Sequence, residues 1–308
     1  MTLREELQKT CMEKDIFSDI IGQEHVKTQI LSALLMGRSI ILVGPPGCGK
    51  TTFAKSIAKS LTNHTFVRVQ GSPDLTAEDL LGDIDPIKAL EYGPLSKEAF
   101  VPGKIFKADK GVLFFDEVNR CPQKIQNALL QVLQEKFATI GSYDVDFPAD
   151  FIFIGTMNPE DTSTEKLSHV FMDRFDMIYV SYPRTLEEEL DILEKDAIKS
   201  VSFDNVLLDK MVSFVRNLRT NEKLSKVPSV RATIGLYERS QSNAILEKRD
   251  SVTARDIFRA VKSVLAHRIE LKPSIKYLTT AEDFVEKEFS IFAKKEALDL
   301  PSSDEVSG

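Results

Sequence analysis

The sequence predicts an α/β fold, a parallel five-stranded sheet with helices, followed by a small all-helical domain. A glycine-rich turn lies between the apolar run 39–43 and a helical pattern, as in a phosphate-loop fold. Strands alternate with helices, and this order implies parallel pairing. After Tyr182-Pro183 only helical patterns remain. We therefore predict an α/β domain at 1–183 and a helical domain at 184–270.

Composition narrows the class of protein. The 308 residues suggest about one to three domains, and a net charge of −7 argues against coating nucleic acid through bulk charge. No apolar stretch approaches the ~20 residues that span a bilayer, and the start lacks the apolar region of a signal peptide. We expect a cytoplasmic protein. The three cysteines and four histidines show no metal-ligand spacing.

The first elements follow from apolar periodicity. A helix after Gly22 places its apolar residues at Val26, Ile30, Ala33 and Leu34, the i, i+4, i+7, i+8 pattern, and should end at Gly37. The strand at 39–43 precedes the glycine-rich turn. A helix with Phe53, Ile57 and Leu61 follows, and 65–69 alternates as a second strand.

An irregular segment at 71–110 comes next and interrupts the α/β pattern. Its four prolines and short helical candidates, such as 77–81, indicate a functional insertion. The continuous apolar run 111–115 ends in two carboxylates, as a buried central strand does. A helix follows it. We then predict a hairpin at 137–150 and two further buried strands at 151–155 and 177–180.

Capping patterns define the second region. Thr185 with Glu188 predicts a helix through about residue 198, and Thr253 with Asp256 predicts another. We expect residues 271–308 to form a tail with one amphipathic helix at 281–295 and a disordered end from Pro301.

The segment 44–52 matches the pattern G-x-x-x-x-G-K-[ST] of a phosphate-binding loop. Its glycines let backbone N–H groups turn toward phosphate oxygens, and the following helix directs the positive end of its dipole at them. Lys50 would neutralise phosphate charge, and Thr51 would hold Mg²⁺. The predicted loop residues are Gly44, Pro45, Pro46, Gly47, Cys48, Gly49, Lys50, Thr51 and Thr52.

Asp116 and Glu117 end a buried strand, at the edge where parallel sheets bind their ligands. We expect Asp116 to hold Mg²⁺ and Glu117 to orient and deprotonate the water that attacks the γ-phosphate. A solvated Asp-Glu pair is the alternative. Beside a phosphate loop, the catalytic interpretation is favoured.

Three later residues are candidates for the same reaction. Asn158 follows the next apolar strand and can bridge the γ-phosphate and the water, although Asn-Pro also favours a turn. Arg174 can reach a neighbouring subunit's γ-phosphate, or it can pair with Asp173 or Asp176. Arg231 opens a helix of the second region, where it either senses phosphate or only begins the helix.

With these residues identified, the chain resembles an AAA+ ATPase of the clade that contains MoxR proteins and the ATPase subunit of magnesium chelatase. The similarity covers about residues 17–270. It implies that Ile21 and Gly22 lie on the adenine side, and that Asn158, Arg174 and Arg231 are sensor 1, the arginine finger and sensor 2. Segments 71–110 and 137–150 correspond to the helix-2 insert and the hairpin before sensor 1.

The two groups within the clade match different stretches. Residues 81–85 and 100–103 resemble the chelatase subunit, whereas 116–122 and 231–233 resemble MoxR proteins. Val230 stands where MoxR proteins usually carry proline.

The resemblance implies an Mg²⁺-dependent ATPase that assembles as a homo-oligomeric ring, typically a hexamer. Such a ring acts as a chaperone-like motor that remodels a partner or inserts a cofactor, with a von Willebrand factor A domain protein. A chelatase motor, with a metal-binding subunit and a tetrapyrrole, is the first alternative. A DNA-associated motor is the second, and the acidic balance disfavours it.

Overall fold

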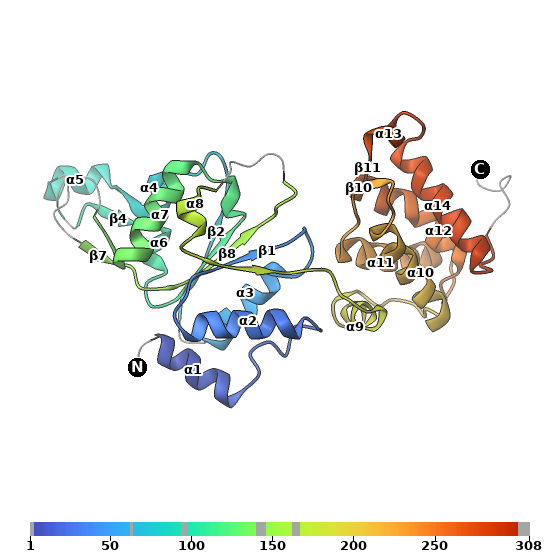
Figure 1. Ribbon diagram of the computed structural model, residues 1–308, viewed down its shortest axis with the longest axis horizontal. Helices are drawn as coiled ribbons and strands as arrows, with labels where there is room; N and C mark the ends of the chain where they lie inside the picture. Colours follow the sequence, from blue (N-terminus) through green and yellow to red (C-terminus); the bar gives the residue numbers. More distant parts are fainter. Residues whose placement is uncertain are drawn as a thin grey trace. The chain divides into compact units, whose positions relative to one another are not determined.

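The computed structural model describes residues 3–61, 64–93, 96, 98–139, 146–161 and 167–300. The chain divides into two compact units, Met1–Ser181 and Tyr182–Gly308 (Figure 1). Each unit has its own hydrophobic core.

A parallel five-stranded sheet forms the centre of the first unit, as the sequence predicts. Its strand order is β2 (Phe66–Gln70), β5 (Val112–Asp116), β8 (Ile152–Met157), β1 (Ile40–Val43) and β9 (Asp176–Tyr179). All four neighbouring pairs are parallel. Every carboxyl end therefore lies at one edge of the sheet, which brings the ends of β1, β5 and β8 together.

Helices cover both faces of this sheet, which explains why β1 is buried at all four positions. On one face lie α1 (Leu3–Glu13), α2 (Glu24–Leu35) and α3 (Lys50–Ser60) (Figure 1). On the other lie α4 (Ala77–Leu81), α6 (Lys104–Lys107), α7 (Gln123–Glu135) and α8 (His169–Met172), packed on strand residues such as Ile41 and Phe115. The sequence analysis did not anticipate α1.

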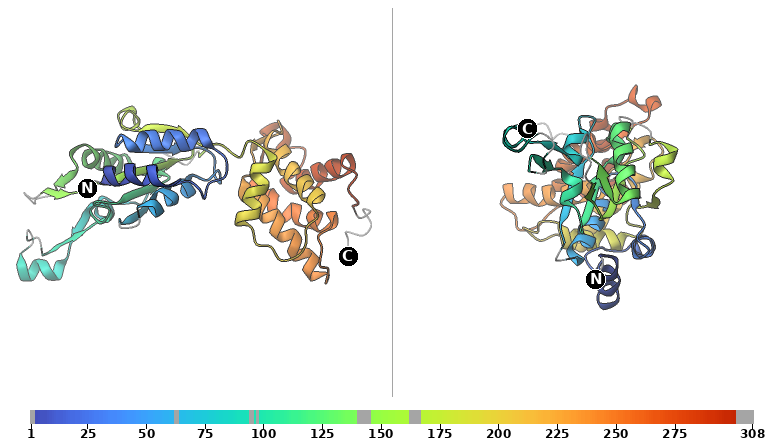
Figure 2. Two further views of the ribbon diagram at one scale, coloured as in Figure 1. Left: turned by 90° about the horizontal axis from the view of Figure 1, so that it is seen from below. Right: turned by 90° about the vertical axis from the view of Figure 1, so that its left-hand side faces the viewer.

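The irregular segment 71–110 extends from the first unit. After α4 it forms an antiparallel ribbon of β3 (Gly82–Ile84) and β4 (Phe100–Pro102), with α5 (Pro86–Tyr92) between them. Figure 2 shows this ribbon and α5 projecting from the body of the unit. No residue of α5 is buried.

The hairpin expected at 137–150 contains β6 (Phe137–Thr139) paired antiparallel with β7 (Asp146–Pro148). Its expected turn, around residues 141–143, lies outside the described residues.

Helices dominate the second unit, which also contains the short antiparallel pair β10 (Leu224–Lys226) and β11 (Glu270–Leu271). Thr185 and Thr253 form the two capping boxes that the sequence predicts. The helices are α9 (Leu186–Asp196), α10 (Asn205–Arg219), α11 (Val230–Leu246), α12 (Ala254–Leu265), α13 (Pro273–Lys276) and α14 (Ala281–Lys295).

The helix predicted in the tail, α14, packs into the core of the second unit. Its buried residues Phe284, Val285, Phe289 and Ala293 share one hydrophobic cluster with α10, α11 and α12. The amphipathic stripe therefore faces the unit's own core. The end expected to be disordered, from Pro301, lies outside the described residues.

Within the part of the chain that the structure describes, no helix is both long enough and apolar enough to cross a bilayer.

Candidate active site

The phosphate loop joins β1 to α3 at the carboxyl edge of the sheet. Gly47 and Gly49 have φ values of 73° and 98°, which side chains other than glycine's adopt at a cost. At Gly44 a Cβ would lie 2.2 Å from the backbone oxygen of Val180. The backbone N–H of Gly44 donates to the oxygen of Met157 at 3.1 Å. These glycines let the loop turn closely against two neighbouring strands.

Lys50 bends back over the loop that precedes it. Its ammonium donates to the backbone oxygens of Gly44 at 2.6 Å and Pro45 at 2.7 Å. Burial raises the pKa of the Cys48 thiol, and nearby Lys50 offsets that rise only in part. The positive charge of Lys50 thus lies beside the backbone oxygens of Gly44 and Pro45, within the loop that is predicted to bind phosphate. Thr51 is partly buried in the first turn of α3, and Thr52 is exposed.

The segment with Ile21 and Gly22 lies beside the loop because of Gln23. Gly22 and Gln23 both have positive φ, 61° and 58°, and the Gln23 amide donates to the oxygen of Cys48 at 3.3 Å. The other amide atom, Gln23 Oε1, is buried without a hydrogen-bond partner among the described residues. The sequence analysis assigned no role to Gln23, although it directly follows Ile21 and Gly22.

Asp116 and Glu117 extend from the end of β5, and Thr156 of the adjacent β8 holds both. The Thr156 hydroxyl donates to Asp116 Oδ1 at 2.6 Å and accepts from the Glu117 backbone N–H at 2.9 Å. Glu117 itself has φ 56° and ψ 52°, a left-handed conformation that costs about 1–2 kcal/mol outside glycine. Gly71 packs against this turn, since a Cβ there would lie 2.1 Å from the Glu117 oxygen.

Polar side chains from two other elements contact these carboxylates. On β2, Arg68 donates to Asp116 Oδ2 at 2.6 Å and Gln70 donates to Glu117 Oε2 at 2.9 Å. Arg120, after β5, forms ion pairs with Glu117 at 3.0 Å and with Asp161. The sequence analysis assigned none of these three a role. Only the alternation of Arg68 and Gln70 on β2 signals that they share a face.

Asn158 follows β8 and reaches the same edge of the sheet. Its Oδ1 accepts from the Glu160 N–H at 3.2 Å, which closes the turn that Asn-Pro favours. Its backbone oxygen accepts from the Asn119 amide at 3.2 Å, while the buried Asn119 Oδ1 has no hydrogen-bond partner among the described residues. The turn and the position at this edge of the sheet therefore coexist.

Arg174 lies at the opposite edge of the sheet. It precedes the first residue of β9, Asp176, which pairs with Ile40 at the amino end of β1. The length of β1 alone, about 13 Å at ~3.3 Å per residue, separates this edge from the phosphate loop. Arg174 is exposed, and its guanidinium lies against the side-chain amide of Gln134, whose oxygen accepts from it once that amide is turned over.

Among the described residues, neither Asp173 nor Asp176 forms an ion pair with Arg174. Asp176 pairs with Arg38, 2.6 Å from Nη2 to Oδ1. Arg38, Gln134 and Arg174 line one pocket, with Gly37, Ser39, Leu130 and Leu133.

Arg231 belongs to the second unit, near the start of α11 (Val230–Leu246), where it is exposed. Ser229 is the N-cap residue but makes no side-chain capping bond.

Comparison with known proteins gives the family. A model described as an AAA domain of the dynein-related subfamily matches residues 39–175, and one described as an AAA lid domain matches 221–288. The chain is 29% identical over 283 residues to "Chaperone MoxR1" of Mycobacterium tuberculosis, covering 82% of this chain and 73% of that protein. It is 26% identical to "Magnesium-chelatase subunit ChlI-2, chloroplastic" of Arabidopsis thaliana, covering 83% and 76%.

A solved structure of a RuvB mutant from Thermotoga maritima has the same fold. Its TM-score is 0.55 at 20% identity, over 94% of this chain and 86% of that one. The phosphate loop, the carboxylates at the end of β5, the sheet order and the helical second unit agree with these matches. The chain is therefore an AAA+ ATPase, of the clade that contains MoxR proteins and the ATPase subunits of magnesium chelatase.

Proposed function

We propose that this ATPase works as a ring of about six identical subunits, with ATP bound between neighbours. The position of Arg174 carries the proposal. It lies at the sheet edge opposite the phosphate loop of its own chain, so it cannot reach the nucleotide bound there. An exposed arginine at that edge can instead stabilise the transition-state charge in the next subunit's site.

Within each subunit, the residues at the carboxyl edge of the sheet have different proposed roles in binding and hydrolysis. Lys50 binds phosphate oxygens, and Glu117 orients and deprotonates the attacking water. Gln70 and Arg120 both contact Glu117 Oε2 and so orient the carboxylate, and Oε1 is the oxygen proposed to accept the proton. Asn158 holds the water from the adjacent strand, and Ile21 and Gly22 lie on the adenine side.

Thr51 and Asp116 fit a magnesium ion. A hydroxyl and a carboxylate are the hard oxygen donors that Mg²⁺ prefers, and Asp116 is oriented by Thr156. Bound with the nucleotide, Mg²⁺ neutralises charge on the phosphates. Arg231 is proposed to contact phosphate from the second unit.

The ring is proposed to act as a chaperone-like motor. The likeness to a protein named Chaperone MoxR1 supports this, and α5 offers exposed apolar side chains such as Leu90, 91% exposed, for contact with a client. A von Willebrand factor A domain protein is the proposed partner, and remodelling or cofactor insertion is the proposed task.

Glu117→Gln tests the base. Hydrolysis should fall by at least about 100-fold while ATP affinity is retained, because only proton transfer is removed. Glu135→Gln, an exposed glutamate at the end of α7, is the matched control and should leave the rate unchanged. Undiminished hydrolysis by Glu117→Gln would remove Glu117 as the base.

Mixing two inactive variants tests the interface. Arg174→Ala subunits keep Glu117, and Glu117→Gln subunits keep Arg174, so mixed rings regain complete sites and activity. Arg38→Ala, which removes a charge from the same pocket, should stay active alone. No rescue at any mixing ratio would contradict action across an interface.

The chelatase motor is the second candidate, favoured by the likeness to a magnesium-chelatase subunit. ATPase rates measured with a von Willebrand factor A protein alone, and with a large chelatase subunit and a tetrapyrrole, separate the two. Strong stimulation by DNA would instead favour a DNA-associated motor.

A further inference from the structure

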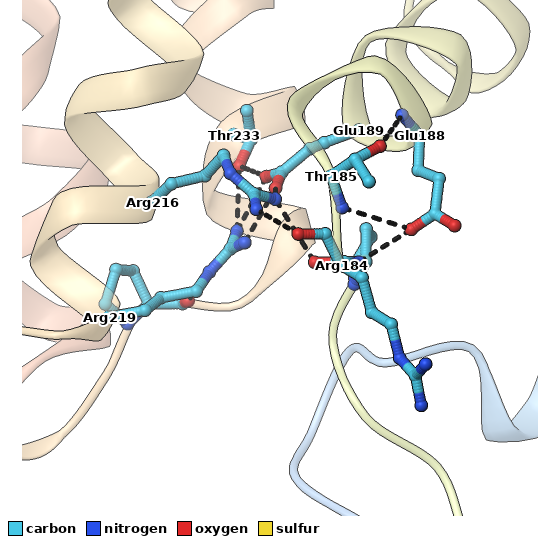
Figure 3. Close-up of polar contacts among 9 residues, drawn as sticks. Arg184, Thr185, Glu188, Glu189, Arg216, Arg219 and Thr233 are labelled. Atoms are coloured by element: carbon cyan, nitrogen blue, oxygen red, sulfur yellow. Dashed lines mark hydrogen bonds and ion pairs between the residues drawn. The ribbon is translucent and has the colours of Figure 1, made fainter. Parts of the chain in front are cut away.

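A buried carboxylate joins three helices of the second unit (Figure 3). Glu189 of α9 is 0% exposed and forms a two-point ion pair with Arg219 of α10, at 2.7 Å and 2.6 Å. The hydroxyl of Thr233, on α11, donates to Glu189 Oε1 at 2.5 Å. A buried ion pair of this kind is stable only when its remaining polar atoms are also satisfied.

One arginine of this cluster also holds the segment by which the chain enters the second unit. Arg216 bonds Glu189 Oε2 and the oxygen of Pro183, both at 3.1 Å, and the oxygen of Arg184 at 2.7 Å. Figure 3 shows Arg216 between Glu189 and this segment. Residues 182–184 are thus fixed to α9 and α10.

The other arginine holds the segment that carries Arg231. Arg219 Nε donates to the oxygen of Pro228 at 2.9 Å, and its guanidinium lies 4.9 Å from the centre of the Tyr182 ring. Thr233, two residues after Arg231 in the chain, donates a hydrogen bond to Glu189. Pro228 and Thr233 are therefore both tied to the same cluster, and Arg231 lies between them in the chain.

The charge state of Glu189 agrees with this geometry. Burial alone would raise the pKa of its carboxyl, but the hydrogen bonds and charge of Arg219, helped by Thr233 and Arg216, lower the pKa below its ordinary value. Glu189 therefore stays ionised near neutral pH, and both arginines keep their partner.

The first unit holds the chain on the other side of this entry segment. The Val180 N–H donates to the Val43 oxygen at 2.8 Å, and the Val180 oxygen packs against Gly44 of the phosphate loop. Ser181 alone separates this anchored residue from Tyr182. A displacement of the loop at Gly44 thus has a short covalent route to the Glu189 cluster.

We propose that Glu189, Arg216 and Arg219 are positioning residues that make the entry segment 182–184 and the start of α11 one rigid body, so that Arg231 follows the movement of the entry segment. The inference rests on the proposed contact of Arg231 with phosphate. None of the three touches the reacting atoms. They act by fixing where Arg231 is presented.

The chain offers a matched control for a role in stability alone. Asp256 is also 0% exposed and pairs with Arg249 at 2.8 Å and 2.6 Å. The side chain of Arg249 contacts Ser251, Glu247 and Asp256, away from both the entry segment and the residues around Arg231.

Arg216→Gln is the test variant, with Arg249→Gln as its control. Arg216 is 23% exposed, and the pair of Arg219 with Glu189 remains, so the unit should fold. Hydrogen exchange of the full chain should quicken in both 182–185 and 229–233 in Arg216→Gln. In Arg249→Gln it should quicken only around residues 249–256. Exchange that quickens at 182–185 but not at 229–233 would overturn the proposed linkage.

ATPase kinetics provide the second measurement. Arg216→Gln should lower kcat by about tenfold with KM nearly unchanged, and it should have no further effect in an Arg231→Ala background, because both act through one residue. Arg249→Gln should leave kcat unchanged. Additive effects of Arg216→Gln and Arg231→Ala would overturn the inference.

The same rates separate this inference from the proposed function. A fully active Arg216→Gln beside a defective Arg231→Ala would remove the positioning role and leave the role of Arg231. An Arg231→Ala variant with wild-type kcat would remove both the role of Arg231 and the inference built on it.

Discussion

Arg68 donates a hydrogen bond of 2.6 Å to the carboxylate of Asp116, from the strand next to the one that Asp116 ends. The positive charge of Arg68 therefore occupies an oxygen of the residue proposed to hold Mg²⁺. We predict that Arg68→Gln strengthens the preference for MgADP over metal-free ADP by about twofold to fivefold, since a half-exposed ion pair contributes about 0.2–1 kcal/mol. Calorimetric titrations with and without a chelator give the ratio.

Lys59→Gln provides the control for Arg68→Gln, because Lys59 pairs with Asp19 on the surface of the same unit. In Lys59→Gln, the ratio of the affinity for MgADP to the affinity for metal-free ADP should match that of the wild type. An unchanged ratio in Arg68→Gln would show that Arg68 does not compete for Asp116.

Gly71 provides a prediction about the placement of Glu117. A Cβ at Gly71 would lie 2.1 Å from the Glu117 oxygen, and the obstructing atom is backbone that cannot swing aside. Gly71→Ala should lower kcat on the order of 100-fold, because a shift of about 1 Å in a catalytic group has that effect. Steady-state kinetics measure the fall in kcat, and a titration with ADP measures the affinity for ADP, which should change little.

Gly235→Ala is the matched substitution for Gly71→Ala. A Cβ at Gly235, within α11, meets its nearest neighbour, on Val264, at an ordinary contact distance of 3.4 Å. The helix should gain about 0.5–1 kcal/mol and kcat should not change. Equal rates in the two variants would contradict the crowding at Glu117.

Continuous apolar runs, and alternation at 65–69, made the five parallel strands predictable, and the rule that ligands bind at carboxyl ends placed Asp116 and Asn158 at one edge. The contacts of Arg68, Gln70 and Thr156 were not predictable, because they depend on the order β2, β5, β8 across the sheet, which periodicity does not encode. Strand order arises from long-range packing.

The Glu189 cluster could not be predicted from the sequence for a different reason. Its members lie on three helices, and a glutamate and two arginines on helices look like solvated surface residues. The amphipathic stripe of α14 was recognised, but its partner was not, because a stripe does not say which core it covers.

His64 predicts a pH dependence for the first unit. Its Nε2 lies 2.7 Å from Glu6 of α1, and its Nδ1 contacts the oxygen of Lys110. The Glu6 hydrogen bond raises the pKa of His64 above 6.5. The stabilisation of protonated His64 is therefore complete below about pH 6.5 and is lost as the pH rises through the higher folded-state pKa.

Urea denaturation at about pH 6 and about pH 8.5 should show this loss, at most about 1 kcal/mol for such an ion pair. His64→Gln should remove this pH dependence, whereas His25→Gln, on the exposed side of α2, should retain it. A wild-type protein whose first unit is more stable at the higher pH would contradict the assignment.

Phe289 provides the test of whether α14 is part of the second unit's core. It is 0% exposed and meets Phe214 of α10 edge to face, with ring centres 4.9 Å apart. Phe289→Ala should cost about 3–5 kcal/mol of unfolding free energy, because it removes buried area and leaves a cavity. Ile291→Ala, on the same helix but 54% exposed, should cost less than about 0.5 kcal/mol. Denaturation monitored by hydrogen exchange in α10 and α12 measures the unfolding free energy of both variants. Equal losses in Phe289→Ala and Ile291→Ala would mean that α14 is a detachable tail.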